Sequence, residues 1–288
     1  MTDPVQVGLV GREILASRSP WLHEREALAQ ELPLRYELVD FTARGFTDAD
    51  LPRVLDDLTA CSFAGVNVTY PFKQAVIPLL TRLSPEAEQI GAVNTVLFRG
   101  ADRIGFNTDV AGFAEAVRAR LSGARLDAVA QLGAGGGGSA TAFALLGLGT
   151  SRLTLVDTDS SRAAALSTRL GAAFPGRAIV VVGAAEDLAA IVRACDGIVN
   201  ATPLGMAKSP GTAVPPGLLE PRHWVADIVY FPLETVLLRA AAAKGCRVLD
   251  GSAMAVEQAA AAFEIFTGRR ADRARMLDAF HAFPAPHA

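Results

Sequence analysis

The chain has 288 residues, of which 51% are hydrophobic and 20% charged, and its formal net charge is −3 at pH 7. This composition is that of a globular protein with a buried core, and the nearly balanced charge argues against nucleic acid or an anionic membrane as a partner. A single core rarely grows beyond about 250–300 residues, so we expect two domains.

Strand-like and helical patterns alternate over the first 110 residues, which predicts an α/β domain with a mostly parallel sheet. The first strand is expected at residues 5–10, and a helix follows at 21–30. The remaining elements predicted here are a strand at 36–41, a helix at 50–58, a strand at 65–69, helices at 72–80 and 85–90, and short strands at 95–98 and 103–105.

A long helix at residues 109–121 leads into a second region with six strand-like runs and helical stretches between most of them. Six strands in this order predict a doubly wound parallel sheet of the Rossmann type. After Gly251 the pattern changes to two helices, at 253–266 and 271–283, which we expect to fold back onto the N-terminal region. The six runs are 128–132, 152–156, 178–182, 196–199, 224–229 and 246–249.

The predicted fold class is therefore α/β with two domains. Residues 1–110, completed by residues 251–288, are expected to form an N-terminal α/β substrate domain. Residues 111–250 are expected to form a Rossmann-type domain with a doubly wound parallel sheet.

The glycines after the strand at 128–132 fit the pattern G-x-G-x-x-G at Gly133, Gly135 and Gly138. In a dinucleotide site the first glycine permits a tight turn, the second lets the backbone approach the pyrophosphate, and the third lets helix and strand pack closely. The following helix offers unpaired N–H groups and the positive end of its dipole to the phosphates. A merely flexible glycine loop is the alternative, but the strand, the helix and a later acid agree with a nucleotide site.

That acid is Asp157, which ends the next strand and follows Gly133 by 24 positions, near the expected spacing of about 20. A carboxylate at this place accepts hydrogen bonds from ribose hydroxyls and repels the 2′-phosphate of NADP, so the sequence favours NAD as cofactor over NADP. Arg152 and Arg162 lie close in the chain, and Asp157 is alternatively an ordinary polar residue at a strand end.

Several polar clusters fall in predicted loops or at strand ends, and their hydroxyls and amides suit a small ligand with many hydroxyl groups. Lys73 is the candidate to accept the proton of an alcohol during its oxidation, and Asp109 is placed to orient the ammonium group. The alternatives are a solvated lysine at a helix start and a helix N-cap aspartate. None of His23, His223, His281 and His287 lies in a polar cluster, so we expect surface or core-edge positions for all four.

The three cysteines, Cys61, Cys195 and Cys246, form no C-x-x-C pair, and no Cys/His cluster has metal-ligand spacing. We therefore expect buried thiols in a reducing compartment and no metal site. The N-terminus lacks a basic segment followed by an apolar one, and no apolar run reaches the ~18 residues of a membrane span. These features predict a soluble, cytoplasmic protein and leave open whether it forms a homodimer.

Short motifs follow one another along almost the whole chain. They are Ser17-x-Ser19-Pro20, Gly65-Val-Asn-Val-Thr-x-Pro-x-Lys73, Gly91-Ala-Val-Asn-Thr95, Asn107-Thr-Asp109, Gly-Ala-Gly-Gly at 133–136, Asn200-Ala-Thr-Pro-Leu-Gly-Met206, Tyr230-x-Pro232-x-x-Thr235 and Gly251-x-x-Met254…Gln258. From residue 8 to about residue 268, this ordered set resembles the shikimate dehydrogenase family. The resemblance implies a two-domain α/β enzyme that transfers hydride reversibly at a ring hydroxyl of shikimate or quinate.

The resemblance also implies roles for individual residues. Lys73 and Asp109 match the family's catalytic pair. The residues that match its substrate ligands are Ser17, Ser19, Thr69, Asn94, Tyr230 and Gln258. The residues that match its pyrophosphate loop are Gly133, Ala134, Gly135, Gly136 and Gly137. The residues that match its nicotinamide side are Thr202, Ile228, Gly251 and Met254.

The sequence departs from the NADP-using members where those carry Asn-Arg-Thr after the second strand of the nucleotide domain. This chain has Asp157-Thr158-Asp159 there, and so it resembles the NAD-dependent quinate/shikimate dehydrogenases of quinate catabolism. An NADP-linked enzyme of aromatic amino acid biosynthesis or an aminoshikimate-type relative is the near alternative. A non-catalytic ligand sensor is the alternative of another class. The sequence does not decide between quinate and shikimate.

Overall fold

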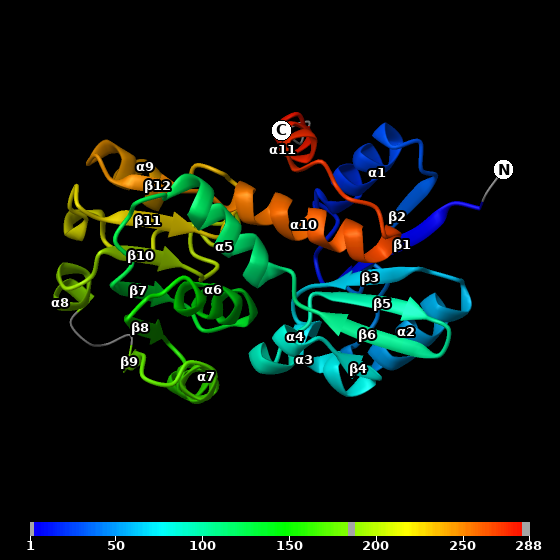
Figure 1. Cartoon of the computed structure of the whole chain (residues 1–288), viewed down its shortest axis with the longest axis horizontal. Coiled ribbons are helices and arrows are strands. Elements are labelled where there is room, and N and C mark those ends of the chain that lie inside the picture. The colour runs from blue at the N-terminus through cyan, green and yellow to red at the C-terminus, as the bar shows by residue number, and fades with distance from the viewer. Residues whose placement is uncertain (1–2, 184–187, 284–288) are drawn as a thin grey trace. The chain divides into compact units, whose positions relative to one another are not determined.

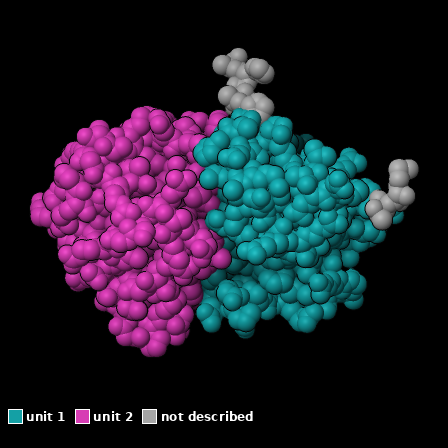
Figure 2. All heavy atoms as spheres, turned by 45° about the horizontal axis from the view of Figure 1, so that its top comes forward, with its two compact units in different colours: residues 1–108, 256–288 teal, residues 109–255 magenta. Residues whose placement is uncertain are grey.

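The structure is a computed structural model, and it describes residues 3–183 and 188–283. The chain divides into two compact units, each with its own six-stranded sheet. Unit 1 comprises residues 1–108 and 256–288, and unit 2 comprises residues 109–255 (Figure 2). Figure 1 labels the elements of both units.

The sheet of unit 1 is mixed, with the strand order β2-β1-β3-β5-β6-β4. Strand β1 runs parallel to β2 and β3, and β4 runs parallel to β6. Strand β5 is antiparallel to both of its neighbours. The strands are β1 (Val5–Gly11), β2 (Leu34–Asp40), β3 (Gly65–Val68), β4 (Arg82–Leu83), β5 (Thr95–Arg99) and β6 (Asp102–Phe106).

Side chains alternate between the two faces of the sheet along each strand, and apolar clusters cover both faces. Val10 of β1 packs in one apolar cluster with Phe41 and Phe72. Val7 packs on the other face with Phe266 of α10. The helices are α1 (Ser19–Ala29), η1 (Asp48–Asp50), α2 (Leu51–Ala60), α3 (Phe72–Ala75), η2 (Ile77–Leu79), α4 (Pro85–Ile90), α10 (Gly251–Thr267), which begins in unit 2, and α11 (Arg273–His281).

Two expectations for unit 1 need correction. The single helix predicted at residues 72–80 is wrong: α3 ends at Ala75 and a separate 3-10 turn begins at Ile77. Pro78 has no N–H to continue the helical bonds, and its ring would collide with the carbonyl of Gln74 in a continuous α-helix. The sheet is also less parallel than expected, because a two-residue turn joins β5 to β6 and makes them a hairpin.

The sheet of unit 2 is parallel throughout, with the strand order β12-β11-β10-β7-β8-β9. This order is that of a doubly wound nucleotide-binding sheet, as predicted, and the chain reverses its winding direction between β7 and β10. The strands are β7 (Ala128–Leu132), β8 (Arg152–Asp157), β9 (Ala178–Gly183), β10 (Gly197–Asn200), β11 (Trp224–Asp227) and β12 (Arg247–Leu249). The helices are α5 (Asp109–Arg120), α6 (Gly136–Gly147), α7 (Ser160–Ala173), α8 (Leu188–Arg193), η3 (Pro216–Leu218) and α9 (Val236–Ala243).

Candidate active site

The glycine loop lies between β7 and α6, at the edge where the winding direction of the unit 2 sheet reverses. Gly133 has a φ of 100°, and a Cβ there would lie 2.5 Å from the carbonyl oxygen of Ala201. A Cβ at Gly138 would collide with the carbonyl oxygen of Gly133, whereas one at Gly135 would meet no atom within 4 Å. The three glycines therefore provide a turn, a close helix–strand contact and an open backbone position.

Gln131 fixes this loop from inside the sheet. Its side chain is fully buried, and its Nε2 donates to the carbonyl oxygens of Gly133 at 2.9 Å and Gly138 at 2.7 Å. Its Oε1 accepts from the hydroxyl of Thr141 at 2.8 Å. Sequence analysis missed Gln131, although an amide in the middle of an apolar strand is a signal that buried polar partners exist.

Asp157 holds the same loop from β8. Its Oδ2 accepts from the N–H of Ala134 at 2.7 Å, and its Oδ1 accepts from the N–H of Asp159 at 2.8 Å. Nη1 of Arg162 lies 3.9 Å from Oδ1 of Asp157, and Nη2 of the same arginine lies 3.2 Å from Oδ2 of Asp159. Arg162 is thus paired with two carboxylates, and these three groups together carry a net charge of −1.

These features fit a dinucleotide. The first N–H groups of α6 have no partner within the helix, and the open position at Gly135 leaves room beside them for a phosphate group. Farther along the same edge, a Cβ at Gly137 would lie 2.7 Å from Cδ1 of Ile228, and one at Gly251 would lie 2.7 Å from the carbonyl oxygen of Ile228. The structure therefore brings Gly137, Ile228 and Gly251 together. Met254 is buried on α10.

A buried carboxyl organises the two loops that follow β10 and β11. Asp227 accepts from Nδ2 of Asn200 at 2.9 Å, the N–H of Val229 at 3.0 Å and the hydroxyl of Thr235 at 2.8 Å. Asn200 in turn accepts from the hydroxyl of Thr202 at 2.6 Å. Burial raises the pKa of Asp227 above its ordinary value, although these hydrogen bonds act in the opposite direction. Thr202 is thus held in place through Asn200.

In unit 1 the predicted substrate ligands Ser17, Ser19 and Thr69 follow the carboxyl ends of β1 and β3. Oγ of Ser17 donates to Oγ of Ser19 at 3.2 Å and accepts from the N–H of Ser19 at 3.2 Å. Thr69 touches Gly11, where any Cβ would collide with its methyl group. The structure therefore brings the loops after β1 and β3 into contact.

Asp40 fixes the loop that carries Ser17, and sequence analysis missed it. Its buried carboxylate accepts four backbone N–H groups, from Glu13 at 3.2 Å, Ile14 at 2.7 Å, Thr42 at 2.9 Å and Ala43 at 3.2 Å. Burial alone would raise the pKa of Asp40, but the four N–H groups outweigh it and hold the pKa below its usual value. The carboxylate is therefore a fixed anionic anchor for this loop.

The remaining predicted residues divide between the units. Lys73 is half-buried on α3, and its carbonyl oxygen accepts from the N–H of Val93 at 2.8 Å. Asn94 is buried directly before β5, and Gln258 lies half-buried on α10. In unit 2, Asp109 is buried as the first residue of α5, where a carboxylate is favoured by the helix dipole. Tyr230 is exposed in the loop after β11.

The expected surface or core-edge position is wrong for His23 and His223, since each is buried with only 1% of its surface exposed. His23 packs at 4.8 Å between ring centroids against Tyr36, and burial lowers its pKa to about 3, so its imidazole is neutral at physiological pH. A neutral ring enclosed by aromatic side chains fits the core rather than a catalytic surface. His281 is exposed, and His287 lies outside the described residues. Cys61 is likewise exposed rather than buried.

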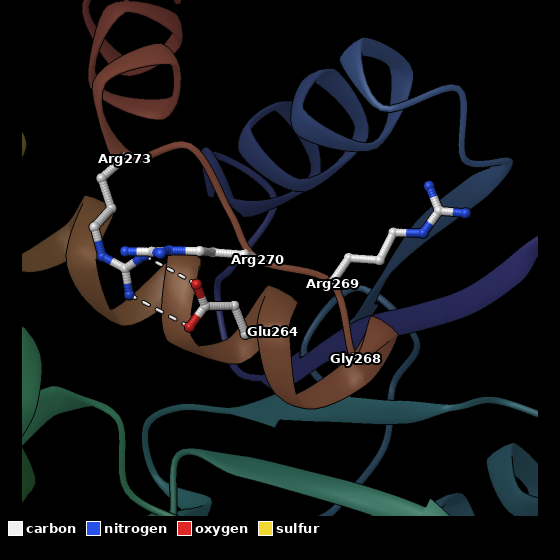
Figure 3. Close-up of a pocket in the computed structure, with 5 residues that line it drawn as sticks. All are labelled: Glu264, Gly268, Arg269, Arg270 and Arg273. Carbon is white, nitrogen blue, oxygen red and sulfur yellow. Dashed lines mark hydrogen bonds and ion pairs between the residues drawn. The ribbon is translucent and has the colours of Figure 1, made fainter.

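A hollow of about 460 Å³ lies elsewhere in unit 1 and contains none of the predicted site residues. Its walls include Glu264, Gly268 and Arg270. Figure 3 shows the guanidinium of Arg273 directed at the carboxylate of Glu264, 2.9 Å away, and Arg269 pointing away from it. Three arginines and one glutamate line this hollow, so its walls carry a net positive charge.

Among residues 3–183 and 188–283, no helix combines the length and apolar character of a membrane span. The same residues contain no cluster of three or more His, Cys, Asp or Glu side chains that could hold a metal ion.

Comparison with family models gives two matches. Residues 9–96 match the shikimate dehydrogenase substrate binding domain, and residues 251–279 match the shikimate 5′-dehydrogenase C-terminal domain. The first match lies in unit 1 and contains Ser17, Ser19, Thr69, Lys73 and Asn94.

Similar proteins cover almost the whole chain. A shikimate dehydrogenase (NADP(+)) of Pseudarthrobacter chlorophenolicus is 48% identical over 97% of this chain and 95% of its own length. A quinate/shikimate dehydrogenase (NAD(+)) of Corynebacterium glutamicum is 44% identical over 97% of this chain and 99% of its own length. The solved structure of quinate dehydrogenase from C. glutamicum in complex with NAD has a TM-score of 0.91 at 43% identity, covering 98% of this chain and all of that one.

Proposed function

Because the chain belongs to the shikimate dehydrogenase family, we propose that it is an NAD-dependent quinate/shikimate dehydrogenase that oxidises the C3 hydroxyl of quinate, shikimate or both. Family membership alone identifies the chain as an oxidoreductase that acts on shikimate or quinate with NAD or NADP. Relatives of nearly equal identity carry different cofactor names, so overall similarity does not choose between the two.

The charge around Arg162 is the observation that carries the choice of NAD. A 2′-phosphate needs an arginine that is not already neutralised, and Arg162 lies 3.9 Å from the carboxylate of Asp157 and 3.2 Å from that of Asp159. The net negative charge disfavours the phosphate of NADP. Asp157 is 7% exposed, and its Oδ2, which accepts from the N–H of Ala134, has a second lone pair for a ribose hydroxyl.

We assign the proton transfer to Lys73 and Asp109. When bound, the nicotinamide accepts the hydride from the substrate carbon. Lys73 takes the proton that the reacting hydroxyl releases, and Asp109 orients its ammonium group. The hydroxyls of Ser17, Ser19 and Tyr230 are proposed to hold the substrate carboxylate. The proposed ligands of the ring hydroxyls are Thr69, Asn94, Asp109 and Gln258.

The test is a matrix of initial rates for the purified chain, with quinate and shikimate against NAD and NADP. We expect kcat/KM with NAD to exceed that with NADP by at least about tenfold, which corresponds to roughly 1.4 kcal/mol. The Lys73→Ala variant, purified in the same way, measures any activity contributed by a host enzyme. A preference for NADP identifies the biosynthetic alternative, and turnover of neither substrate with either cofactor leaves the ligand-sensor alternative.

A further inference from the structure

Five buried side chains of unit 1, among them the predicted ligand Asn94, form a continuous hydrogen-bonded chain. The hydroxyl of Tyr36 donates to Oδ1 of Asn67 at 2.8 Å, and Nδ2 of Asn67 donates to Oγ1 of Thr95 at 3.0 Å. Oγ1 of Thr95 donates to Oδ1 of Asn94 at 3.0 Å, and Nδ2 of Asn94 donates to Oγ1 of Thr108 at 2.9 Å. None of the five residues is more than 7% exposed.

Backbone groups fix the direction of this chain. Nδ2 of Asn67 also donates to the carbonyl oxygen of Asn94 at 3.3 Å, and a carbonyl can only accept. Oδ1 of Asn67 must therefore face Tyr36, whose hydroxyl must donate. At the other end, Oδ1 of Asn94 accepts from the backbone N–H of Thr108 at 2.8 Å, and an N–H can only donate. The orientations of both amides are thus determined.

The direction has a consequence for Asn94. Its Oδ1 is occupied by Thr95 and by the backbone of Thr108, while its Nδ2 uses one hydrogen for Oγ1 of Thr108. Within residues 3–183 and 188–283, no acceptor meets the second Nδ2 hydrogen. Rotating the amide would set its NH2 group against the N–H of Thr108, two donors facing each other in a buried place, which is costly.

We propose that this hydrogen-bonded series of side chains makes Asn94 a one-way hydrogen-bond donor to the substrate. Asn94 then recognises an acceptor oxygen of a hydroxyl or keto group on the substrate ring. Tyr36, Asn67 and Thr95 are positioning residues, because they act on the ligand only through Asn94. This inference rests on the proposed function, in which Asn94 is a substrate ligand.

Thr95→Val tests the chain, because valine keeps the shape of the buried side chain and removes its hydroxyl. Thr95→Ser is the matched control, since it keeps the hydroxyl and removes only the methyl group. We expect Thr95→Val to raise KM for quinate and shikimate by about fivefold to tenfold and to change kcat by less than about twofold. Thr95→Ser should stay within about twofold of the wild type in KM.

Two further measurements complete the test: the affinity for NAD and the effect of a variant at Tyr36. The Kd for NAD, titrated separately, should be unchanged in both Thr95 variants. Tyr36→Phe removes the first donor of the hydrogen-bonded series and should raise KM by a smaller factor than Thr95→Val does. In the double variant, the rise in KM should be smaller than the product of the two single rises. Equal effects of Thr95→Val and Thr95→Ser would indicate packing instead of hydrogen bonding and would overturn the proposal, as would an unchanged KM in Thr95→Val.

A failure of the proposed function itself is distinguishable. If the wild type neither binds nor oxidises quinate or shikimate, the family-based function is wrong. The hydrogen-bonded series of side chains is then tested by NMR of the side-chain NH2 groups of Asn67 and Asn94 in ¹⁵N-labelled protein. Slow hydrogen exchange in the wild type and faster exchange in Thr95→Val would support the one-way orientation of Asn94, and equal exchange in the two would overturn it.

Discussion

The two units hold their candidate ligand-binding loops in different ways. In unit 2, Gln131 and Asp157 bond directly to the backbone of the glycine loop from two neighbouring strands. In unit 1, Oδ1 of Asn94 accepts from the backbone N–H of Thr108 and from the hydroxyl of Thr95, which in turn accepts from Asn67. Two direct supports act side by side, so the loss of one leaves the other. In unit 1, one of the two bonds to Asn94 depends on a series of side chains, so the loss of Thr95 or Asn67 weakens that bond and leaves the N–H of Thr108 in place.

The units also differ in the predicted roles of the residues they carry. Most of the proposed substrate ligands and Lys73 belong to unit 1, whereas the glycine loop, Asp157 and Arg162 belong to unit 2. Substitutions of these unit 1 residues should therefore change turnover or substrate parameters, as should those of Asp109 and Tyr230, whereas substitutions in the glycine loop and at Asp157 should change cofactor affinity or selectivity.

The largest expected effect is that of Lys73→Ala on turnover. Removing a general acid–base group typically costs 10²–10⁴-fold, so kcat should fall by roughly that factor. NAD affinity should be unchanged if the division between the units holds. Steady-state kinetics with quinate and shikimate measure kcat, and a fluorescence titration measures NAD binding.

The control for this assignment is Asp109→Asn, alone and combined with Lys73→Ala. If the two residues act as a unit, the double variant should lose less than the product of the two single losses. Near wild-type kcat in Lys73→Ala at every pH would show that another group takes the proton. Tyr230 would then be the next candidate.

The second largest effect is expected in the stability of unit 1, from Asp40→Ala. Four backbone N–H groups would lose their acceptor, which should lower the free energy of unfolding by about 3 kcal/mol at pH 7. Because the pKa of Asp40 is lowered in the folded state, its contribution is complete above the ordinary value of about 4 and is lost as the pH falls through the lowered pKa.

Denaturant unfolding of the wild type and Asp40→Ala at pH 7 and near pH 3 measures this difference. It should shrink at the lower pH. Asp48→Ala is the matched control, because Asp48 is a largely exposed partner of Arg12, and its loss should cost less than about 1 kcal/mol. A difference of the same size at both pH values would contradict an ionised Asp40 as the anchor.

The glycine loop could be predicted from the sequence because a Cβ at Gly133 or Gly138 would collide with neighbouring backbone, a requirement that the spacing of the motif reflects. The parallel sheet of unit 2 could be predicted because its strands and helices alternate regularly. The break at Pro78 also had a local signal, since proline interrupts a helix. The series of hydrogen-bonded side chains that includes Tyr36 and Asn94 could not be predicted, because most of its members are far apart in the sequence and meet only in the folded sheet, where Asn67 pairs with Thr95.

Cofactor selectivity is the third prediction, and it concerns unit 2 alone. Asp157→Ala removes the carboxylate that repels a 2′-phosphate, an effect of about 1–3 kcal/mol, so the ratio of kcat/KM for NAD to that for NADP should narrow by roughly 5–150-fold. The substitution also removes the acceptor of the Ala134 N–H, so the Kd for NAD should rise as well.

Asp157→Asn separates these two effects, since it removes the charge and keeps one acceptor oxygen. It should narrow the cofactor ratio with a smaller loss of NAD affinity than Asp157→Ala. Initial rates with both cofactors and NAD titrations of both variants provide the comparison. A cofactor ratio unchanged in both variants would exclude Asp157 as the selective group.

The smallest expected effect is that of Gln131→Leu. Leucine fits the apolar strand, but the buried carbonyl oxygens of Gly133 and Gly138 lose their donor. Asp157 still holds the N–H of Ala134, so the loop should loosen rather than unfold, and the Kd for NAD should rise about tenfold, or roughly 1.4 kcal/mol. The KM for quinate and shikimate at saturating NAD should stay within about twofold of the wild type, because their proposed ligands lie mostly in unit 1.

Thr150→Val is the matched control for a buried polar group in unit 2, because the Thr150 hydroxyl has no hydrogen-bond partner among the described residues. It should leave NAD affinity unchanged. Isothermal titration of NAD into the wild type and the two variants measures the effect. An equal rise in Kd for both variants would mean that any buried change in this unit weakens the loop. A change confined to Gln131→Leu would identify the two carbonyl contacts as the support that acts beside Asp157.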